Sequence, residues 1–475
     1  MSVVPLRKEV DVAIIGAGSA GLPAYRAARK FTDRLVMIEG GPYGTTCARV
    51  GCMPSKLLIA AAEAAHEVER AHGFGVHSAP PQINGREVMD RVRRERDRFV
   101  GFVLEGVESI PAEHHIRGYA RFEDAHTLRV DDHTQIHAKR IVIATGSSPN
   151  VLPMFEGLGD RLIVNDDVFN WESLPQSVAV FGPGVIGLEL GQALHRLGVR
   201  IRMFGVGGFL GPLSDPEIKA YAVRLFQGEF PLDPDAQVRS LERVETGVSV
   251  RFVDPATGAE QEEVFEYVLA ATGRKPNVRG LALENTGLRL DPRGVPLFDS
   301  RTMQCGDSHI FIAGDVNHTL PLLHEAADEG KIAGTNAGTF PDVQPGLRRS
   351  PLSVVFSDPQ IAIVGQSWQE LQNRPFVQGQ VSFENQGRSR VMLRNRGLLH
   401  TYADPQSGRF LGAEIFGPQA EHLGHLLAWA HQQEMSVEQM LGMPFYHPVI
   451  EEGLRTALRD TQSQVHASGS LKKSA

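Results

Sequence analysis

The chain has 475 residues, a length typical of about three domains. Its 48 basic and 56 acidic side chains leave a net charge of −8, so we expect no binding to nucleic acid or to an anionic membrane surface. No apolar run reaches the roughly 18 residues that a membrane span needs, and a strand-like segment begins within about ten positions of Met1, leaving no room for a signal peptide. We therefore expect a cytoplasmic protein in a reducing compartment, where a close cysteine pair is more often catalytic than structural.

The first motif is a glycine-rich turn at residues 16–21, GAGSAG, which follows the apolar run Val10–Ile15. An alanine-rich helix at Leu22–Arg29 and a strand at Arg34–Ile38 are predicted after it. Glycines at this spacing permit a tight turn and let backbone amides approach a pyrophosphate at a helix N-terminus. Glu39 ends the second strand, where a carboxylate can accept hydrogen bonds from a ribose hydroxyl. The segment predicts a dinucleotide-binding unit.

Two of the three cysteines, Cys47 and Cys52, have four residues between them in the stretch GTTCARVGCMPSK. A zinc site built from cysteine needs about four ligands, and Cys305 has no Cys or His at ligand spacing, so we do not expect a metal. Three cysteines in a chain of this length are also not typical of a disulfide-built protein. A redox pair that opens and closes, or two inert thiols, are the remaining interpretations, and we favour the first.

Helix geometry limits how Cys47 and Cys52 can meet. In a straight helix, residues five apart are separated by about 7.5 Å along the axis, whereas bridged cysteines need Cα atoms within about 4.4–6.8 Å. A bridge therefore requires a distorted helix start, and Gly51 supplies the backbone freedom for one. The positive end of a helix dipole and the charge of Lys56 would both favour a thiolate there.

The chain then predicts helices at 57–71 and 86–110, antiparallel strands across 118–138, and a buried strand at 140–144 followed by Thr145-Gly146. An internal repeat of the first unit follows: a strand at 177–181, the turn GPGVIG at 182–187, a helix at 188–197 and a strand at 199–204. Gly205 stands where the repeat would place its ribose-binding acid. No arginine follows it in residues 205–209, so we expect NAD to be preferred, although NADP is not excluded.

The last third predicts one strand at 263–271 leading to ATGRKPN, a buried strand at 309–313 before Gly314-Asp315, and a helix at 321–337. A linker at 341–351 precedes segments that alternate like a mixed sheet, at 353–364 and 376–416, and helices near 421–432, 437–441 and 449–458. From Asp460 on the chain is polar and small, which predicts a frayed tail. Pro448 disfavours helical geometry at His447, and Glu452 in the following helix could orient the imidazole, although a capping histidine is also compatible with this spacing.

Together these motifs resemble the flavin-dependent pyridine nucleotide–disulfide oxidoreductases of the dihydrolipoamide dehydrogenase and glutathione reductase type. The resemblance covers almost all of residues 8–460, with GAGSAG, Glu39, C-x4-C-x-P-S-K, ATG, GPGVIGLE, ATGRKPN, AGD and His447-Pro448 with Glu452 in the family's order. It implies an α/β fold with two three-layer, Rossmann-like dinucleotide-binding domains and a C-terminal α+β dimerisation domain. The implied segments are 1–150 and 274–345 for the FAD domain, 151–273 for the NAD(P) domain, 346–460 for dimerisation and 461–475 for a flexible tail.

The resemblance also implies roles for individual residues. Cys52 would form the charge-transfer thiolate next to FAD, and Cys47 would exchange with the external dithiol or disulfide. Lys56 would lie near the flavin with Glu189 as its partner. In a homodimer, His447 oriented by Glu452 would act on the partner subunit's Cys47. Gly16, Gly18, Gly21, Glu39 and Asp315 would bind FAD, and Gly182, Gly184 and Gly187 would bind the nicotinamide dinucleotide. The other residues expected to bind a cofactor are Thr145, Gly146, Gly273 and Gly314.

Within the family, mercuric reductase and the large thioredoxin reductases resemble this chain but add a C-terminal cysteine or selenocysteine pair, which the tail lacks. Soluble transhydrogenase lacks the second cysteine of the pair. Glutathione reductase typically has a tyrosine where this chain has Val185. We therefore predict a dihydrolipoyl dehydrogenase-like enzyme acting on a small dithiol, disulfide or lipoyl group. The alternatives are an NAD(P)H-dependent reductase of a disulfide, quinone or metal ion, and a flavoprotein that serves only as a redox-gated binding module. Gly205 and Val449 are the two departures from the family pattern.

Overall fold

Strand β1 (Leu6–Ile15) lies inside the first sheet of the computed structural model, which describes residues 5–473. It pairs in parallel with β2 (Leu35–Glu39) on one side and with β6 (Thr134–Ile143) on the other. Residues 12–15 of β1 are buried, as expected for a parallel strand covered on both faces. The strand order is β3-β2-β1-β6-β5-β4, with β17 also paired to β6. The other bounds are β3 (His115–Arg117), β4 (Ala120–Phe122), β5 (Thr127–Val130) and β17 (Ile310–Ile312).

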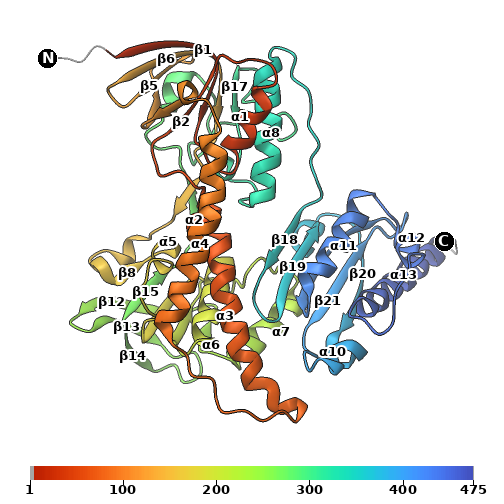
Figure 1. The fold of residues 1–475 in the computed structure, drawn as a ribbon. Helices are drawn as coiled ribbons and strands as arrows, with labels where there is room; N and C mark the ends of the chain where they lie inside the picture. Colours follow the sequence, from red (N-terminus) through yellow and green to blue (C-terminus); the bar gives the residue numbers. More distant parts are fainter. Residues whose placement is uncertain (1–4, 474–475) are drawn as a thin grey trace. The chain divides into compact units, whose positions relative to one another are not determined.

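Helices α1 (Gly21–Ala28) and α8 (Leu323–Thr339) pack side by side against this sheet (Figure 1). The two helices belong to the first and the last segment of one unit, which consists of residues 1–57, 90–150 and 273–348. The second unit consists of residues 58–89, 151–272 and 349–475, so the chain leaves the first unit and returns to it. Residues 58–89, which we placed in the first domain, pack with the second unit.

The second unit contains a parallel sheet of order β11-β10-β9-β15-β8. Its central strand β9 (Ser177–Phe181) is buried at every residue and pairs with β10 (Arg200–Phe204) and β15 (Tyr267–Ala270). Helix α6 (Val185–Arg196) connects β9 to β10, which gives a β-α-β unit like that of β1, α1 and β2. The predicted internal repeat is present in the fold. The outer strands are β8 (Leu162–Ile163) and β11 (Leu232–Asp233).

The single strand that we predicted at 263–271 is wrong, because the chain forms two strands there. Strand β14 (Glu260–Phe265) belongs to a separate antiparallel sheet of order β12-β13-β14, whereas β15 belongs to the parallel one. The break falls at Glu266, whose backbone N–H donates to Ser177 Oγ at 3.0 Å instead of to a strand partner. The other strands of the antiparallel sheet are β12 (Val238–Val244) and β13 (Gly247–Val253).

The C-terminal sheet is antiparallel throughout and not mixed as predicted, with order β18-β19-β22-β21-β20. Helix α11 (Ala420–Gln432) packs against β19 and β22, and α13 packs against β20 and β21. The strands are β18 (Leu352–Val355), β19 (Gln360–Gly365), β20 (Val377–Ser382), β21 (Leu398–Ala403) and β22 (Phe410–Gly417).

Helix α13 (Glu451–Lys473) extends well past residue 460, so the frayed tail that we predicted from Asp460 on is wrong for the described residues. The reason is side-chain burial. Thr461 is fully buried, and its hydroxyl lies 2.6 Å from that of Thr401 on β21. Asp460 also accepts a hydrogen bond from the backbone N–H of Gln380 on β20 at 2.9 Å. The sheet therefore continues to hold the helix.

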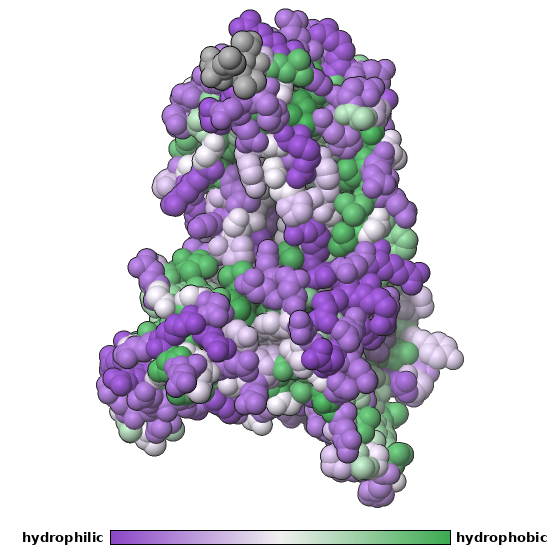
Figure 2. All heavy atoms as spheres, turned by 60° about the vertical axis from the view of Figure 1, so that its left-hand side comes forward, coloured by the Kyte–Doolittle hydropathy of each residue, from purple (hydrophilic) through white to green (hydrophobic). Residues whose placement is uncertain are grey.

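The remaining helices connect these layers: α2 (Thr46–Val50), α3 (Cys52–Arg70), α4 (Gly85–Glu108), α5 (Asn165–Val168), α7 (Pro216–Gln227), α9 (Trp368–Leu371), α10 (Gly387–Val391) and α12 (Val437–Leu441). Strands β7 (Ser147–Pro149) and β16 (Arg274–Pro276) form a two-stranded antiparallel sheet within the first unit. No helix in the described part of the chain is long and apolar enough to span a membrane. On the face in Figure 2, hydrophilic residues predominate and hydrophobic ones form scattered patches.

Candidate active site

The predicted distortion between the two cysteines is confirmed. Helix α2 ends at Val50, helix α3 begins at Cys52, and Gly51 between them has φ −129° and ψ −116°, outside the helical region. Thr45 caps the first helix by accepting a hydrogen bond from the backbone N–H of Ala48 at 3.3 Å. The break places Cys47 in a short first helix and Cys52 at the N-terminus of a 19-residue helix.

Cys47 and Cys52 are not joined by a disulfide in this structure; Cys52 is exposed and Cys47 is half-buried. The hydrogen bond with Cys52, together with burial, holds the pKa of the Cys47 thiol well above its ordinary value. Cys47 therefore keeps its proton at neutral pH. Cys305 is fully buried in the core of the first unit, and burial raises the pKa of its thiol to about 12. Burial without a neighbouring cation explains why we assign no chemistry to Cys305.

Lys56 lies one turn beyond Cys52 on α3, and its Nζ donates to Ser55 Oγ at 3.4 Å. Ser55 in turn donates to the backbone carbonyl of Cys52 at 3.1 Å. Glu189 is buried on α6, where its Oε1 accepts a hydrogen bond from the backbone N–H of Phe356 at 3.0 Å. Because Lys56 and Glu189 belong to different units, their pairing stays a prediction.

In the first glycine-rich turn, two of the three glycines leave no space for a side chain and the third does. A Cβ built at Gly16 would lie 2.3 Å from the carbonyl oxygen of Ala144, and one at Gly21 would lie 1.9 Å from that of Gly16. Only glycine fits at these two positions, because no real Cβ approaches a carbonyl so closely. A Cβ at Gly18 would meet no atom within 4 Å. This free space is what a ligand phosphate approaching the backbone would need.

Glu39 ends β2 beside this turn. Its Oε2 accepts a hydrogen bond from the backbone N–H of Ala17 at 2.8 Å, and its Oε1 accepts one from Gly41 at 2.7 Å. These bonds fix the carboxylate at the carboxyl end of β2, beside the glycine-rich turn that follows β1. Each carboxylate oxygen has a further lone pair, so the group can still accept from a ribose hydroxyl.

Asp315, the turn at Thr145 and the residues that follow Gly273 lie in one hydrogen-bonded network of the first unit. Thr145 Oγ1 donates to the backbone carbonyl of Asn277 at 2.8 Å, and Asn277 Nδ2 donates back to the carbonyl of Thr145 at 2.9 Å. Ser147 Oγ donates to Asp315 Oδ2 at 2.8 Å. Arg274 Nε donates to the same Ser147 oxygen at 2.8 Å.

The glycines of this network, Gly146, Gly273 and Gly314, have φ of +69°, +92° and +80°. At Gly146 and Gly273 a Cβ would meet no atom within 4 Å, whereas at Gly314 it would lie 2.8 Å from the Cβ of Ala20. Sequence reasoning missed Ser147, Arg274 and Asn277, although the similarity of ATGSSPN and ATGRKPN pointed to this pairing of β7 with β16.

The second glycine-rich turn repeats the contacts of the first. A Cβ at Gly182 would lie 2.4 Å from the carbonyl oxygen of Ala271, and one at Gly187 would lie 1.9 Å from that of Gly182. A Cβ at Gly184 would meet no atom within 4 Å. As in the first turn, the first and last glycines leave no space for a side chain, whereas the middle glycine does.

The end of the second strand differs between the two units, because Gly205 has no side chain. A Cβ at Gly205 would lie 2.6 Å from the carbonyl oxygen of Pro234 and 2.9 Å from the Cγ of Pro183. A glutamate at position 205 would therefore not fit without a shift of the backbone. The site of the missing acid is occupied by the segment that follows β11.

His447 and Glu452 form the predicted pair. His447 Nδ1 lies 3.0 Å from Glu452 Oε2 and 3.1 Å from Oε1, and the His447 side chain is 80% exposed. The hydrogen bond from His447 lowers the pKa of the Glu452 carboxyl. Glu452 also accepts from the backbone N–H of Val449 at 3.3 Å, which fixes the turn. With Nδ1 committed to the carboxylate, Nε2 of His447 is left to face solvent or a substrate.

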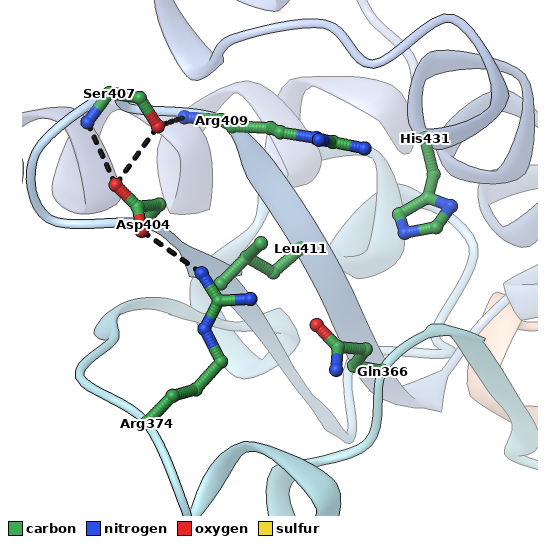
Figure 3. A pocket seen from close by; sticks show the side chains of 7 residues that line it. All are labelled: Gln366, Arg374, Asp404, Ser407, Arg409, Leu411 and His431. Atoms are coloured by element: carbon green, nitrogen blue, oxygen red, sulfur yellow. Dashed lines mark hydrogen bonds and ion pairs between the residues drawn. The ribbon is translucent and has the colours of Figure 1, made fainter.

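Two cavities lie in the C-terminal part of the second unit. One, of about 440 Å³, is lined mainly by apolar side chains and includes Tyr446 and Val449, the neighbours of His447-Pro448. The other, of about 460 Å³, is polar (Figure 3). Arg374 in its lining is paired to Asp404 at 3.0 Å, and none of the predicted site residues lines this cavity. Among residues 5–473 no cluster of three or more His, Cys, Asp or Glu could hold a metal ion.

Comparison with known proteins identifies the family. Residues 10–330 match the model described as pyridine nucleotide-disulphide oxidoreductase, and residues 352–458 match the dimerisation domain of the same family. The dihydrolipoyl dehydrogenase of Thermus scotoductus is 29% identical over 467 residues, covering 96% of this chain and 98% of that protein. The mercuric reductase of Shigella flexneri is 32% identical and covers 96% of this chain and 81% of that protein.

Among solved structures, LpdA from Mycobacterium tuberculosis has a TM-score of 0.80 at 24% identity, covering 96% of this chain and 99% of that chain. The Cu(II) complex of the flavoprotein disulfide reductase RclA from Escherichia coli has a TM-score of 0.78 at 23% identity, covering 95% and 99%. These two likenesses support the predicted fold. The chain is an enzyme of the pyridine nucleotide–disulfide oxidoreductase family, whose members use FAD and NAD(P)H, and its dimerisation domain supports a homodimer.

Proposed function

We propose that the protein is a dihydrolipoyl dehydrogenase-like oxidoreductase that transfers electrons between a small dithiol or lipoyl group and NAD(H). The observation that carries this proposal is the cysteine pair on either side of the break at Gly51. In this pair, Cys52 is exposed at a helix N-terminus, whereas Cys47 is half-buried and the pKa of its thiol is raised. In the reduced pair this asymmetry favours a thiolate on Cys52 and a proton on Cys47, as the proposed role of Cys52 requires.

The residues present fit an FAD molecule in the first unit. Gly18 leaves open backbone beside the N-terminus of α1, and the Glu39 carboxylate is fixed at the end of β2. The group would be held by Gly16, Gly18, Gly21, Glu39, Thr145, Gly146, Gly273, Gly314 and Asp315. When bound, FAD supplies the two-electron carrier between thiols and nicotinamide.

The remaining chemistry belongs to the side chains. One substrate thiolate attacks Cys47 Sγ of the oxidised pair, forming a mixed disulfide and releasing Cys52 as a thiolate. The second substrate thiolate attacks the substrate sulfur of that mixed disulfide, closing the substrate disulfide and releasing Cys47. The net reaction is dithiol plus NAD⁺ giving disulfide, NADH and a proton. The helix N-terminus and Lys56 stabilise the Cys52 thiolate.

A base is needed because a dithiol must lose a proton before it attacks. We assign this role to Nε2 of His447, since Nδ1 is held by Glu452 at 3.0 Å. Following the resemblance, His447 of one subunit would serve the partner subunit's Cys47. The hydrogen bond to Glu452 stabilises the imidazolium that forms when the proton is taken.

A second candidate is an NAD(P)H-dependent reductase of a disulfide, quinone or metal ion, because the Shigella flexneri relative that matches at 32% identity is a mercuric reductase. The chain lacks a cysteine pair near its C-terminus. The test is to compare purified holoenzyme with dihydrolipoamide and NAD⁺, with NADPH and oxidised glutathione, and with NADPH and Hg²⁺. We expect turnover with the first pair to exceed the others by at least roughly a hundredfold.

A further inference from the structure

The absent acid at Gly205 leaves open what would distinguish NAD from NADP in the second unit. In dinucleotide-binding folds, the ligand lies at the carboxyl ends of the parallel strands, and an acid at the end of the second strand binds the ribose 2′-hydroxyl and repels a 2′-phosphate. The relevant strand is β10, which ends at Phe204. Any carboxylate that the fold brings to this end could serve the same purpose.

The neighbouring strand brings one. Strands β10 and β11 are parallel, with Phe204 opposite Asp233, so the residues after β11 emerge beside Gly205. The backbone fastens them there: the N–H of Gly205 donates to the Asp233 carbonyl at 2.7 Å, and the N–H of Ala236 donates to the Gly205 carbonyl at 2.9 Å. The segment 233–236 therefore lies against the end of β10.

This segment has two carboxylates: Asp233 is half-buried and accepts a hydrogen bond from the backbone N–H of Asp235 at 3.0 Å, and Asp235 is the one that reaches the turn after β10. It is exposed, and its Oδ1 accepts a hydrogen bond from the backbone N–H of Gly207 at 2.7 Å. Gly207 and Gly208 have φ of +68° and +69°, so the turn after β10 folds back toward the carboxylate. Pro183, in the second glycine-rich turn, would lie 2.9 Å from a Cβ at Gly205, so these segments meet at one strand end.

We propose that Asp235 replaces the missing acid at position 205 and makes the enzyme selective for NAD(H) over NADP(H). Asp235 Oδ2, which is not used by Gly207, accepts from a ribose hydroxyl, and the carboxylate charge opposes a 2′-phosphate. Among residues 205–209, where a cation would attract that phosphate, the sequence has none. This inference rests on the proposed function only in taking the second unit as the nicotinamide dinucleotide site.

The test is Asp235→Asn, which keeps an oxygen acceptor for Gly207 and removes the charge. Dissociation constants of NAD⁺ and NADP⁺ are measured by calorimetry on the oxidised holoenzyme, so no dithiol substrate is involved. We expect the ratio of the NADP⁺ constant to the NAD⁺ constant to fall by roughly tenfold or more. In the wild type this ratio should also shrink at high salt, because an exposed charge is screened.

The matched control is Asp254→Asn, since Asp254 also accepts backbone hydrogen bonds in a turn of the same unit, from Ala256 and Thr257. This variant should leave the ratio unchanged. Thermal unfolding and flavin content check that each variant folds, and Asp235→Ser replaces the asparagine variant if that one does not.

An unchanged ratio in the Asp235 variant, or a wild type that binds NADP⁺ more tightly than NAD⁺, would overturn the inference. If the wild type oxidises no dithiol and the ratio still falls, the proposed function fails and the inference stands.

Discussion

The two glycine-rich turns of this chain share their backbone contacts but differ in where an acid can stand. A Cβ built at Gly21 or at Gly187 would lie 1.9 Å from the carbonyl oxygen of the first glycine of its turn. A Cβ built at the first glycines, Gly16 and Gly182, would lie 2.3 and 2.4 Å from the carbonyl oxygens of Ala144 and Ala271. In both turns only the middle glycine is open.

The difference lies at the end of the second strand. Glu39 is fixed by two backbone amides beside the first turn, whereas Gly205 is closed to any side chain by Pro234. The comparison teaches that the turn itself is set by steric limits on the backbone. In our proposal, the choice of nucleotide is set separately, by the strand that brings a carboxylate to the ribose.

The largest effect should come from a closed glycine. Gly21→Ala places a methyl group 1.9 Å from a carbonyl oxygen, so β1 and α1 must separate. We expect purified protein to lose its flavin, and its dithiol–NAD⁺ activity with it, because a methyl group this close to a carbonyl oxygen should exceed the usual overpacking cost of about 1–3 kcal/mol. The flavin absorbance per mole of protein measures this loss.

The Gly187→Ala variant should instead keep its flavin and lose nucleotide binding. Equal flavin loss in both variants would show that the two turns do not act separately.

A residue outside both turns should separate two activities. His447→Gln cannot accept a proton, so we expect dithiol–NAD⁺ turnover to fall by about 10²–10⁴-fold. NADH reduction of an artificial dye that takes electrons from the flavin should be spared. Glu452→Gln should cause a smaller loss, because the imidazole stays but is less well oriented. Loss of dye reduction in His447→Gln would point to a structural defect.

The same variant tests the subunit assignment. Mixing His447→Gln with Cys47→Ser and re-forming dimers should restore one active site per heterodimer. Subunit exchange is verified by mass spectrometry with differently tagged chains. Exchange without recovered activity would mean that His447 works within its own chain.

The open glycines should give the next smaller effect. Gly18→Ala and Gly184→Ala add a methyl group that meets no protein atom within 4 Å, so both proteins should fold with unchanged thermal stability. Each methyl enters space that we assign to a ligand, so affinity should fall roughly tenfold to a hundredfold, for FAD in the first and for NAD⁺ in the second. Calorimetry on apoprotein and holoenzyme measures both. Unchanged affinities would show that the ligands do not approach these positions.

The pH dependence of Cys47 should be the smallest of these effects. The pKa of its thiol is raised by the hydrogen bond with Cys52 and by burial, so its thiolate appears only above the ordinary cysteine pKa of about 8.5. In the reduced protein, alkylation of Cys47 at that pH should be roughly tenfold slower than that of a free cysteine and should rise as the pH increases. Peptide mass mapping separates it from Cys52 and Cys305. Alkylation of Cys47 at the rate of free cysteine would contradict the assigned asymmetry.

Much of the fold and of the candidate site could be predicted, because the spacing of the glycines reflects where the local backbone has no space for a side chain. The break at Gly51 follows from the distance that a cysteine pair must span. Asp235 could not be predicted, since its position depends on the pairing of β11 with β10, which no local pattern records. The length of α13 was missed for a similar reason, because Thr461 is polar but is buried against Thr401, 60 residues earlier. Long-range contacts decided both cases.

The most direct test is anaerobic turnover of dihydrolipoamide with NAD⁺ by the wild type, Cys47→Ser and Cys52→Ser proteins. We expect the wild type to form one NADH per dithiol oxidised, and both variants to lose this activity while the flavin stays bound. A wild type that gives no NADH from the dithiol but oxidises NADPH with glutathione disulfide or Hg²⁺ would contradict the proposed function.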